Sequence, residues 1–128
     1  MRRAGQINAE ALAAARDATH PGATTADLNA AAEEVLKKYG VYSPFLNYPG
    51  PYPYPASTTV SVNEELVHGI PSRKRKLRTG DIVSIDCGTV YDGFVADSAI
   101  TVPVGEVAEN IDQLLQVTEE AVFIGAAK

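Results

Sequence analysis

Asp86 and Asp97 stand eleven residues apart and are the side chains best placed to do chemistry. Between them lies Asp92-Gly93, a strong hairpin-turn signal because both positions tolerate positive φ. A two-residue loop there sets Gly88 opposite Asp97, with Asp86 two residues along the same strand. The two carboxylates are then diagonal neighbours on one face, with backbones roughly 7–8 Å apart. They repel unless a proton or a cation lies between them, and a pair of hard divalent cations is one fitting occupant.

A second interpretation of the aspartates remains open. Aspartates near strand ends are common, and most are solvated or cap turns. Asp92 and Asp81 are better explained in this way, by the turns at Asp92-Gly93 and Gly80-Asp81. The spacing alone therefore leaves both a shared metal site and solvated carboxylates as explanations of the pair.

His68 is the third candidate. Residues 58–62 alternate in polarity and predict a half-buried strand, and Asn63-Glu64 can turn the chain. Residues 65–68 are expected to return as a strand that Gly69 and Pro71 interrupt. A lone histidine in a strand is usually a packed or surface residue. At the end of an element, before Gly and Pro, it is better interpreted as an exposed functional residue on a rigid base.

These three motifs resemble those of the methionine aminopeptidases. Residues 62–71 resemble the histidine signature of that family, residues 80–86 the strand with its first aspartate, and residues 92–97 the segment with its second. The spacings of eighteen residues from the histidine and eleven between the aspartates also agree. The resemblance covers nearly the whole chain. It implies half of a pita-bread fold, the creatinase/aminopeptidase-like architecture.

The resemblance also implies roles. Asp86 and Asp97 would be ligands of two divalent metal ions (Co, Mn, Fe or Zn), and His68 would be catalytic, contacting the substrate near the scissile amide. Tyr54 and Thr59 would line the methionine pocket. The implied function is metal-dependent removal of the initiator methionine from nascent polypeptides. The alternatives are a catalytically inactive binding protein of the same fold, and a proline-specific or creatine-cleaving relative.

Two segments depart from the family pattern. The family usually carries an aromatic-His-Gly-Asp run at the second aspartate, whereas residues 94–97 are Phe-Val-Ala-Asp. The segment 47–55 is longer and richer in proline than the usual pocket loop. Both differences concern the pocket more than the metal pair.

The family resembles a duplicated α/β unit, and its second unit supplies one histidine and two glutamates to the metal centre. The sequence stops at Lys128, before any of them. We therefore expect residues 1–128 to be the amino-terminal part of a catalytic domain, truncated at both ends and inactive alone. The missing carboxy-terminal half is the expected partner.

Composition narrows the remaining function classes. The net charge of −5 and the isoelectric point near 4.9 argue against general nucleic-acid binding. The basic run 73–78 is interpreted as a solvated loop, with contact to RNA or the ribosome as the alternative. The single cysteine, Cys87, fits a reducing compartment and hence the cytoplasm, and alternation places its thiol on the face opposite Asp86. No apolar run is long enough for a membrane span or a signal peptide.

The remaining pattern predicts a layered α+β protein, with helices packed on one face of a mostly antiparallel sheet. The expected elements are helices over residues 4–19, from Thr24 or Thr25 onward, and from 107–109 onward, and strands near 58–62, 65–68, 82–86 and 94–102. Thr24 and Asp27 form an approximate capping box. Residues 43–57 hold five of the eight prolines and form either a stiff connection or a pocket rim. The outer strand and the apolar side of the last helix are expected to be uncovered.

Overall fold

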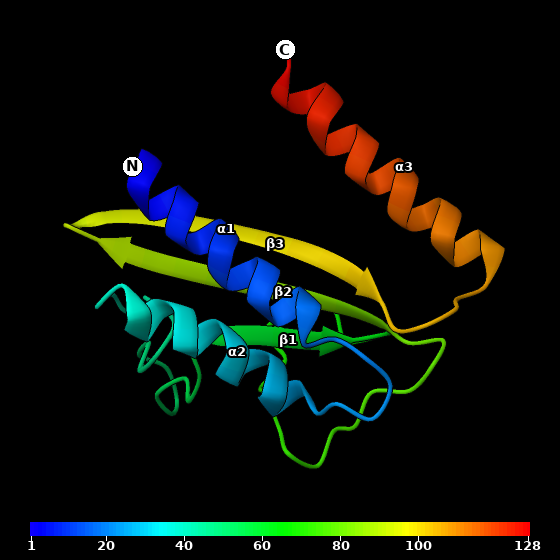
Figure 1. Cartoon of the computed structure of the whole chain (residues 1–128), viewed down its shortest axis with the longest axis horizontal. Helices are drawn as coiled ribbons and strands as arrows, with labels where there is room; N and C mark the ends of the chain where they lie inside the picture. Colours follow the sequence, from blue (N-terminus) through cyan, green and yellow to red (C-terminus); the bar gives the residue numbers. More distant parts are fainter.

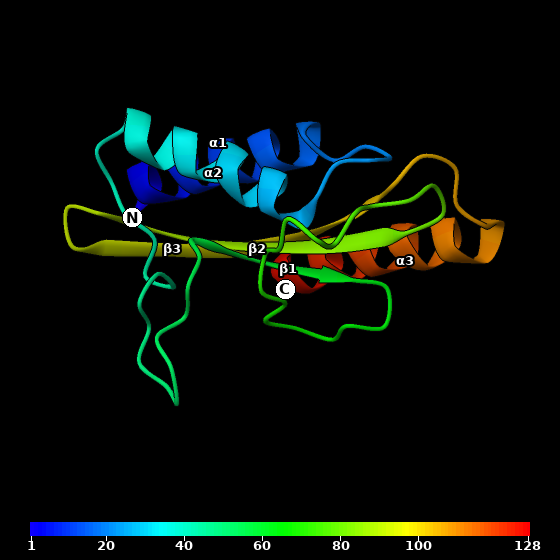
Figure 2. The ribbon, with the colours of Figure 1, turned by 90° about the horizontal axis from the view of Figure 1, so that it is seen from below.

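The computed structural model describes residues 1–128 and contains three helices and one three-stranded sheet. The elements in chain order are α1 (Arg2–Asp17), α2 (Thr25–Lys38), β1 (Thr58–Val62), β2 (Ile82–Tyr91), β3 (Phe94–Pro103) and α3 (Glu109–Ala126). The sheet has the order β1-β2-β3, and both pairs are antiparallel. Helices α1 and α2 lie side by side on one face of it, and the loop 43–57 projects from the other (Figures 1 and 2). The predicted α+β architecture is confirmed.

The second helix begins where the sequence predicts. The Thr24 hydroxyl accepts a hydrogen bond from the backbone N–H of Asp27 at 3.3 Å, and the Asp27 carboxylate accepts one from the backbone N–H of Thr24 at 2.7 Å. This is a complete capping box. The helix ends before Gly40, whose φ of 63° is a conformation that only glycine adopts at little cost.

Alternation along β2 divides the sheet into two faces. Val83, Ile85 and Cys87 are fully buried against the helices, whereas Ser84 and Asp86 between them are half-exposed. We call these the helix face and the open face. The core on the helix face joins apolar residues of both helices to those of the strands: Ile7, Ala11, Leu12, Ala15, Leu28, Ala32, Val35, Leu36, Val60, Val62, Val83, Ile85 and Cys87. Burial of this core fixes which side chains of β2 and β3 point to the open face.

The strand predicted over residues 65–68 does not form, and that prediction was wrong. His68 has a φ of 60°, far from the extended backbone of a β-strand, and none of residues 65–68 pairs with another strand. The carboxylate of Glu65 accepts a hydrogen bond from the backbone N–H of Val62 at 2.9 Å, in the place of a strand partner. Residues 63–81 therefore form a long loop between β1 and β2. In compensation, β2 extends beyond the predicted end at 86 and reaches the hairpin turn.

The outer strand of the sheet, β3, and the last helix, α3, are uncovered, as predicted. Every residue of β3 is half-exposed or exposed, and no residue of α3 is buried. Large apolar side chains of α3 face solvent, with Val122 and Phe123 exposed by 65% and 69%. The helix lies beyond the edge strand β3 and away from α1 and α2 (Figure 1). None of the three helices has the length and apolarity that a membrane span requires.

Candidate active site

The β2–β3 hairpin brings Asp86 and Asp97 together as the turn chemistry predicts. Asp92 and Gly93 have φ of 50° and 75°, and Tyr91 pairs with Phe94 across the two-residue loop. In this register Gly88 lies opposite Asp97 and Asp86 lies opposite Ala99. Both carboxylates belong to the open face, on adjacent strands and one pleat apart.

The two carboxyl groups interact directly. Burial raises the pKa of Asp86 to about 6, and the charge of Asp97 and a hydrogen bond shared with its carboxyl group add to that rise. The positive charge of His68 acts in the opposite direction, so the imidazole lies within electrostatic reach of the pair. A raised pKa means that the folded protein binds a proton more tightly at this point than a free carboxylate would, and that two ionised carboxylates repel here unless a cation lies between them.

Thr59 and Tyr54 lie beside the pair on the open face. Thr59 of β1 pairs with Asp86 and is 7% exposed. The Tyr54 hydroxyl lies 3.1 Å from the carbonyl oxygen of Thr58 and 3.0 Å from that of Gly69, and it donates its proton to these acceptors. Burial, followed by the nearby charge of Asp86, raises the pKa of Tyr54 to about 12. The hydroxyl is thus committed to backbone, and only the ring of Tyr54 is free to line a pocket.

His68 is exposed and is held by its neighbour on a rigid base. A Cβ atom at Gly69 would collide with the carbonyl group of Val60, so only glycine fits there. The Gly69 carbonyl accepts a hydrogen bond from Val60 N–H at 2.9 Å, and the Gly69 N–H donates one to Ser61 Oγ at 3.1 Å. These bonds hold His68 in a left-handed conformation that is costly for a residue with a side chain, which favours a functional explanation.

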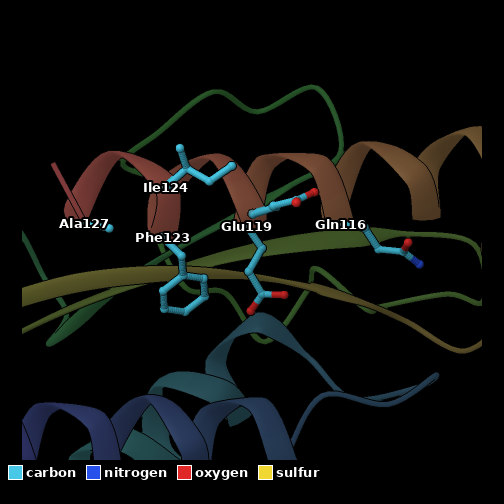
Figure 3. Close-up of a pocket in the computed structure, with 6 residues that line it drawn as sticks. Gln116, Glu119, Phe123, Ile124 and Ala127 are labelled. Carbon is cyan, nitrogen blue, oxygen red and sulfur yellow. The ribbon is translucent and has the colours of Figure 1, made fainter.

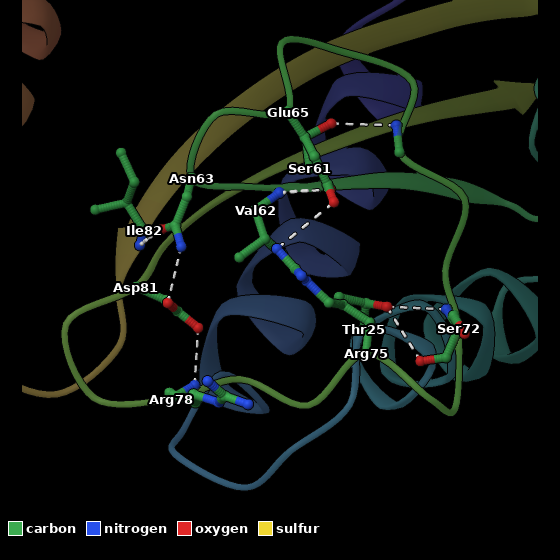
Figure 4. A network of polar contacts seen from close by, with 11 residues as sticks. Thr25, Ser61, Val62, Asn63, Glu65, Ser72, Arg75, Arg78, Asp81 and Ile82 are labelled. Carbon is green, nitrogen blue, oxygen red and sulfur yellow. Dashed lines mark hydrogen bonds and ion pairs between the residues drawn. The ribbon is translucent and has the colours of Figure 1, made fainter.

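The rest of the loop 63–81 is tied down by a polar network (Figure 4). Asn63 donates to the Asp81 carboxylate at 2.9 Å, which in turn accepts from the backbone N–H of Arg78 at 2.8 Å. At the other side, the hydroxyl of Thr25 bonds to the backbone of Ser72. Asp81 thus closes a turn, as predicted. The basic side chains of residues 73–76 and 78 are exposed on this loop.

Sequence reasoning missed Gly88 and the residues that cover it. A Cβ atom at Gly88 would lie 2.8 Å from Pro44 Cγ and 3.1 Å from Phe45 Cε1. The start of the loop 43–57 therefore packs onto the open face directly opposite Asp97. The available signal was the glycine itself, because glycine inside a strand often marks the close approach of another segment.

The side-chain chemistry of the pair fits hard divalent cations, since both groups offer carboxylate oxygens. No group of three or more histidine, cysteine, aspartate or glutamate side chains lies together so as to hold a metal ion. Asp86 and Asp97 therefore provide a partial ligand set. Cys87 does not join it, because its thiol is buried on the helix face, where burial, followed by the charges of both aspartates, raises its pKa to about 12.

A hollow of about 500 Å³ lies elsewhere, along α3 (Figure 3). It is lined only by side chains of that helix and of the residue that follows it: Gln116, Glu119, Glu120, Phe123, Ile124 and Ala127. Its size does not make it the better candidate, because it is a shallow surface of one uncovered helix. At the carboxylate pair, by contrast, two strands, the loop 43–57 and the loop with His68 converge.

Comparison with known proteins places this geometry in a family. The profile of metallopeptidase family M24 matches residues 1–128, and the chain belongs to that family. A methionine aminopeptidase of Clostridium acetobutylicum is 45% identical over 128 residues, which are 100% of this chain and 50% of the relative. The resemblance to the methionine aminopeptidases is thereby confirmed. The chain spans about half the length of the curated relatives that it matches.

Solved structures support the fold in the same way. The crystal structure of a methionine aminopeptidase from Thermotoga maritima matches with a TM-score of 0.88 at 42% identity, over 94% of this chain and 47% of that one. Aminopeptidase P from E. coli matches with a TM-score of 0.66 at 27% identity, over 84% of this chain and 23% of that one. The chain thus has the α+β architecture of about half of a pita-bread fold.

Proposed function

We propose that residues 1–128 form the amino-terminal part of the catalytic domain of a metal-dependent aminopeptidase that removes the initiator methionine. The carboxylate pair carries this proposal: Asp86 and Asp97 lie together on the open face, where burial and the charge of Asp97 raise the pKa of Asp86. Membership of a metallopeptidase family supports it. The higher structural similarity to a methionine aminopeptidase than to aminopeptidase P favours methionine over proline specificity.

In this proposal each side chain has a distinct role. Asp86 and Asp97 would hold two divalent ions, of Co, Mn, Fe or Zn, which when bound lower the pKa of a water molecule and polarise the amide carbonyl. His68 is exposed beside the pair and donates a hydrogen bond to the amide or to the charge that develops on it. The ring of Tyr54, whose hydroxyl is bonded to backbone, lines the methionine pocket together with Thr59.

The metal centre needs more protein ligands than this chain provides. Two carboxylates cannot fix two ions, because useful metal sites need several protein ligands with supporting contacts. We propose that the carboxy-terminal half of the catalytic domain supplies the further ligands. The partial ligand set and the uncovered β3 and α3 support this, as does the length of the relatives.

The substrate, the compartment and a contact with the ribosome complete the proposed function. The substrate is a polypeptide with an amino-terminal methionine, and the compartment is the cytoplasm, in keeping with the one free, buried thiol of Cys87. The exposed basic side chains of residues 73–76 and 78 are the candidate contact for the ribosome. Neutralising Arg73, Lys74, Arg75 and Lys76 tests that contact by co-sedimentation with ribosomes, with peptide hydrolysis as the control for folding.

The test of the function restores the other half of the domain, by gene extension or as a separate chain. We expect the 128-residue chain alone to release no methionine from Met-Ala peptides, and the restored protein to do so with added Co²⁺ or Mn²⁺. His68→Ala should then lower kcat by about a hundredfold or more with little change in KM, because the lost hydrogen bond acts on the transition state. Metal affinity should persist.

His20→Ala removes the only other histidine and serves as the matched control. Hydrolysis by the 128-residue chain that is lost in Asp97→Ala would contradict the expected division of the ligands. A restored protein that binds metal but cleaves no methionine-initiated peptide would instead identify a non-catalytic binding protein of the same fold.

A further inference from the structure

Asn8 is a polar residue in an apolar place. It lies on the face of α1 that packs against the sheet, next to Ile7 and one turn from Ala4 and Ala11, and it is only 1% exposed. A buried amide costs free energy unless its donor and acceptor are both satisfied. A role that an alanine or leucine could not fill is therefore expected for it.

The amide group is satisfied by both strands of the hairpin at once. Asn8 Oδ1 accepts a hydrogen bond from the hydroxyl of Thr89 on β2 at 2.8 Å. Asn8 Nδ2 donates one to the hydroxyl oxygen of Ser98 on β3, also at 2.8 Å. Thr89 is fully buried, and no buried side-chain polar atom of the chain lacks a partner.

These two bonds bracket the rung that carries the second aspartate. Thr89 follows Gly88 and Ser98 follows Asp97, and Gly88 and Asp97 are paired across the strands. Since successive side chains of a strand point to opposite faces, Asn8 holds the hairpin from the helix face while Asp97 points to the open face. A slip of one residue would turn Asp97 toward the helices.

The hairpin needs such a clamp at this point. β1 pairs with β2 only from Val83 to Cys87, so the rung at Gly88 lies beyond its reach. The outer edge of β3 has no neighbour. Past Cys87 the sheet is a two-stranded ribbon with a single further bridge, between Tyr42 and Val90, and isolated two-stranded ribbons are marginally stable.

We propose that Asn8 is a positioning residue: its two hydrogen bonds fix the register and height of Asp97 relative to Asp86, and so set the geometry in which the pair binds a divalent cation. The metal part of this inference rests on the proposed function. The positioning part concerns only the hairpin and stands without it.

The test measures both parts in the 128-residue chain. Asn8→Ala and the milder Ser98→Ala, which changes an exposed residue, each remove the bond to β3. We expect amide hydrogen exchange over residues 88–98 to accelerate by about tenfold in Asn8→Ala, which loses two bonds, and by less in Ser98→Ala. Mn²⁺ affinity, measured by calorimetry, should fall by about tenfold or more in Asn8→Ala, as is usual for residues that orient metal ligands.

Ile7→Val is the matched control, because it removes a buried methyl group from the same helix without touching the clamp. If Ile7→Val accelerates exchange over residues 88–98 as much as Asn8→Ala at equal global stability, or if neither clamp variant accelerates it, the inference is wrong. Unchanged Mn²⁺ affinity in Asn8→Ala would overturn the metal part of the inference. If the unaltered 128-residue chain binds no Mn²⁺, the affinities are compared in the protein restored with its other half; no binding there means that the metal site of the proposed function fails, while hydrogen exchange still decides the role of Asn8.

Discussion

Asp86→Asn should stabilise the protein while it destroys the proposed metal pair. The amide has nearly the same shape as the carboxylate and removes the repulsion from Asp97. A pKa raised from 3.8 to about 6 corresponds to at most about 3 kcal/mol of destabilisation at neutral pH. Because Asp86 is only half-buried, solvent screening reduces the expected gain to about 1 kcal/mol, or about 4 °C in Tm.

The sign of the pH dependence follows from the raised pKa. The folded protein binds the Asp86 proton more tightly than the unfolded chain does, so this contribution to stability is complete below about pH 4. It is lost as the pH rises through about 6, where the folded-state carboxyl ionises. Asp86→Asn has no such group, and its advantage over the unaltered protein should therefore grow between pH 4 and pH 7.

Urea unfolding followed by circular dichroism at pH 4 and pH 7.5 measures this difference. Asp92→Asn is the control, because it removes one charge from the same hairpin and asparagine suits the positive φ of that turn. Added Mn²⁺ should stabilise the unaltered protein but not Asp86→Asn. Equal stability of Asp86→Asn and the unaltered protein at pH 7.5, or the same pH profile in both, would refute the raised pKa that burial and Asp97 give to Asp86.

Three further predictions concern other parts of the fold. Gly69→Ala should lower the free energy of unfolding, measured in urea, by about 1–3 kcal/mol, since the added Cβ meets the Val60 carbonyl. The control Gly5→Ala should not lower it, because nothing lies within 4 Å of that position, and an equal loss of stability in both variants would contradict the tight packing at Gly69. In absorbance at 295 nm, Tyr54→Phe should remove an ionisation near pH 12 that Tyr48→Phe leaves in place; if it persists, the Tyr54 hydroxyl is not held as described. Replacing Val122 by Lys and Phe123 by Glu should reduce self-association in sedimentation, whereas the control Glu119→Gln should not. Equal self-association of the double variant and the control would show that the apolar side of α3 does not mediate it.

The parts of the structure that the sequence predicts are governed by local chemistry. Asp92-Gly93 determines the two-residue turn of the β2–β3 hairpin, and this turn fixes how the two strands pair. That pairing places Asp86 and Asp97 on the same face. The capping box of α2 is equally local, because Thr24 and Asp27 are three residues apart. A pattern confined to one turn can be interpreted without knowledge of the rest of the chain.

The parts that the sequence does not predict depend on contacts between distant segments. Leu66 and Val67 are apolar and suited to a strand, but His68 adopts a positive φ, which the hydrogen bonds of Gly69 to β1 hold in place. The bonds of Asn8 join residues 81 and 90 positions away along the chain. From the sequence alone, the helical periodicity shows only that Asn8 interrupts an apolar stripe, and not which residues it binds.

The two faces of the sheet separate stability from chemistry. On the helix face, apolar side chains of β2 are fully buried, and the polar cluster of Asn8 is completely hydrogen-bonded. On the open face, two carboxylates are held together against their repulsion, and a histidine is held in a costly backbone conformation. A protein tolerates such local conflicts where they serve a function and where the surrounding structure offsets their cost. Because the conflicts gather around Asp86, Asp97 and His68, the open face is the part of this molecule that folding alone does not explain.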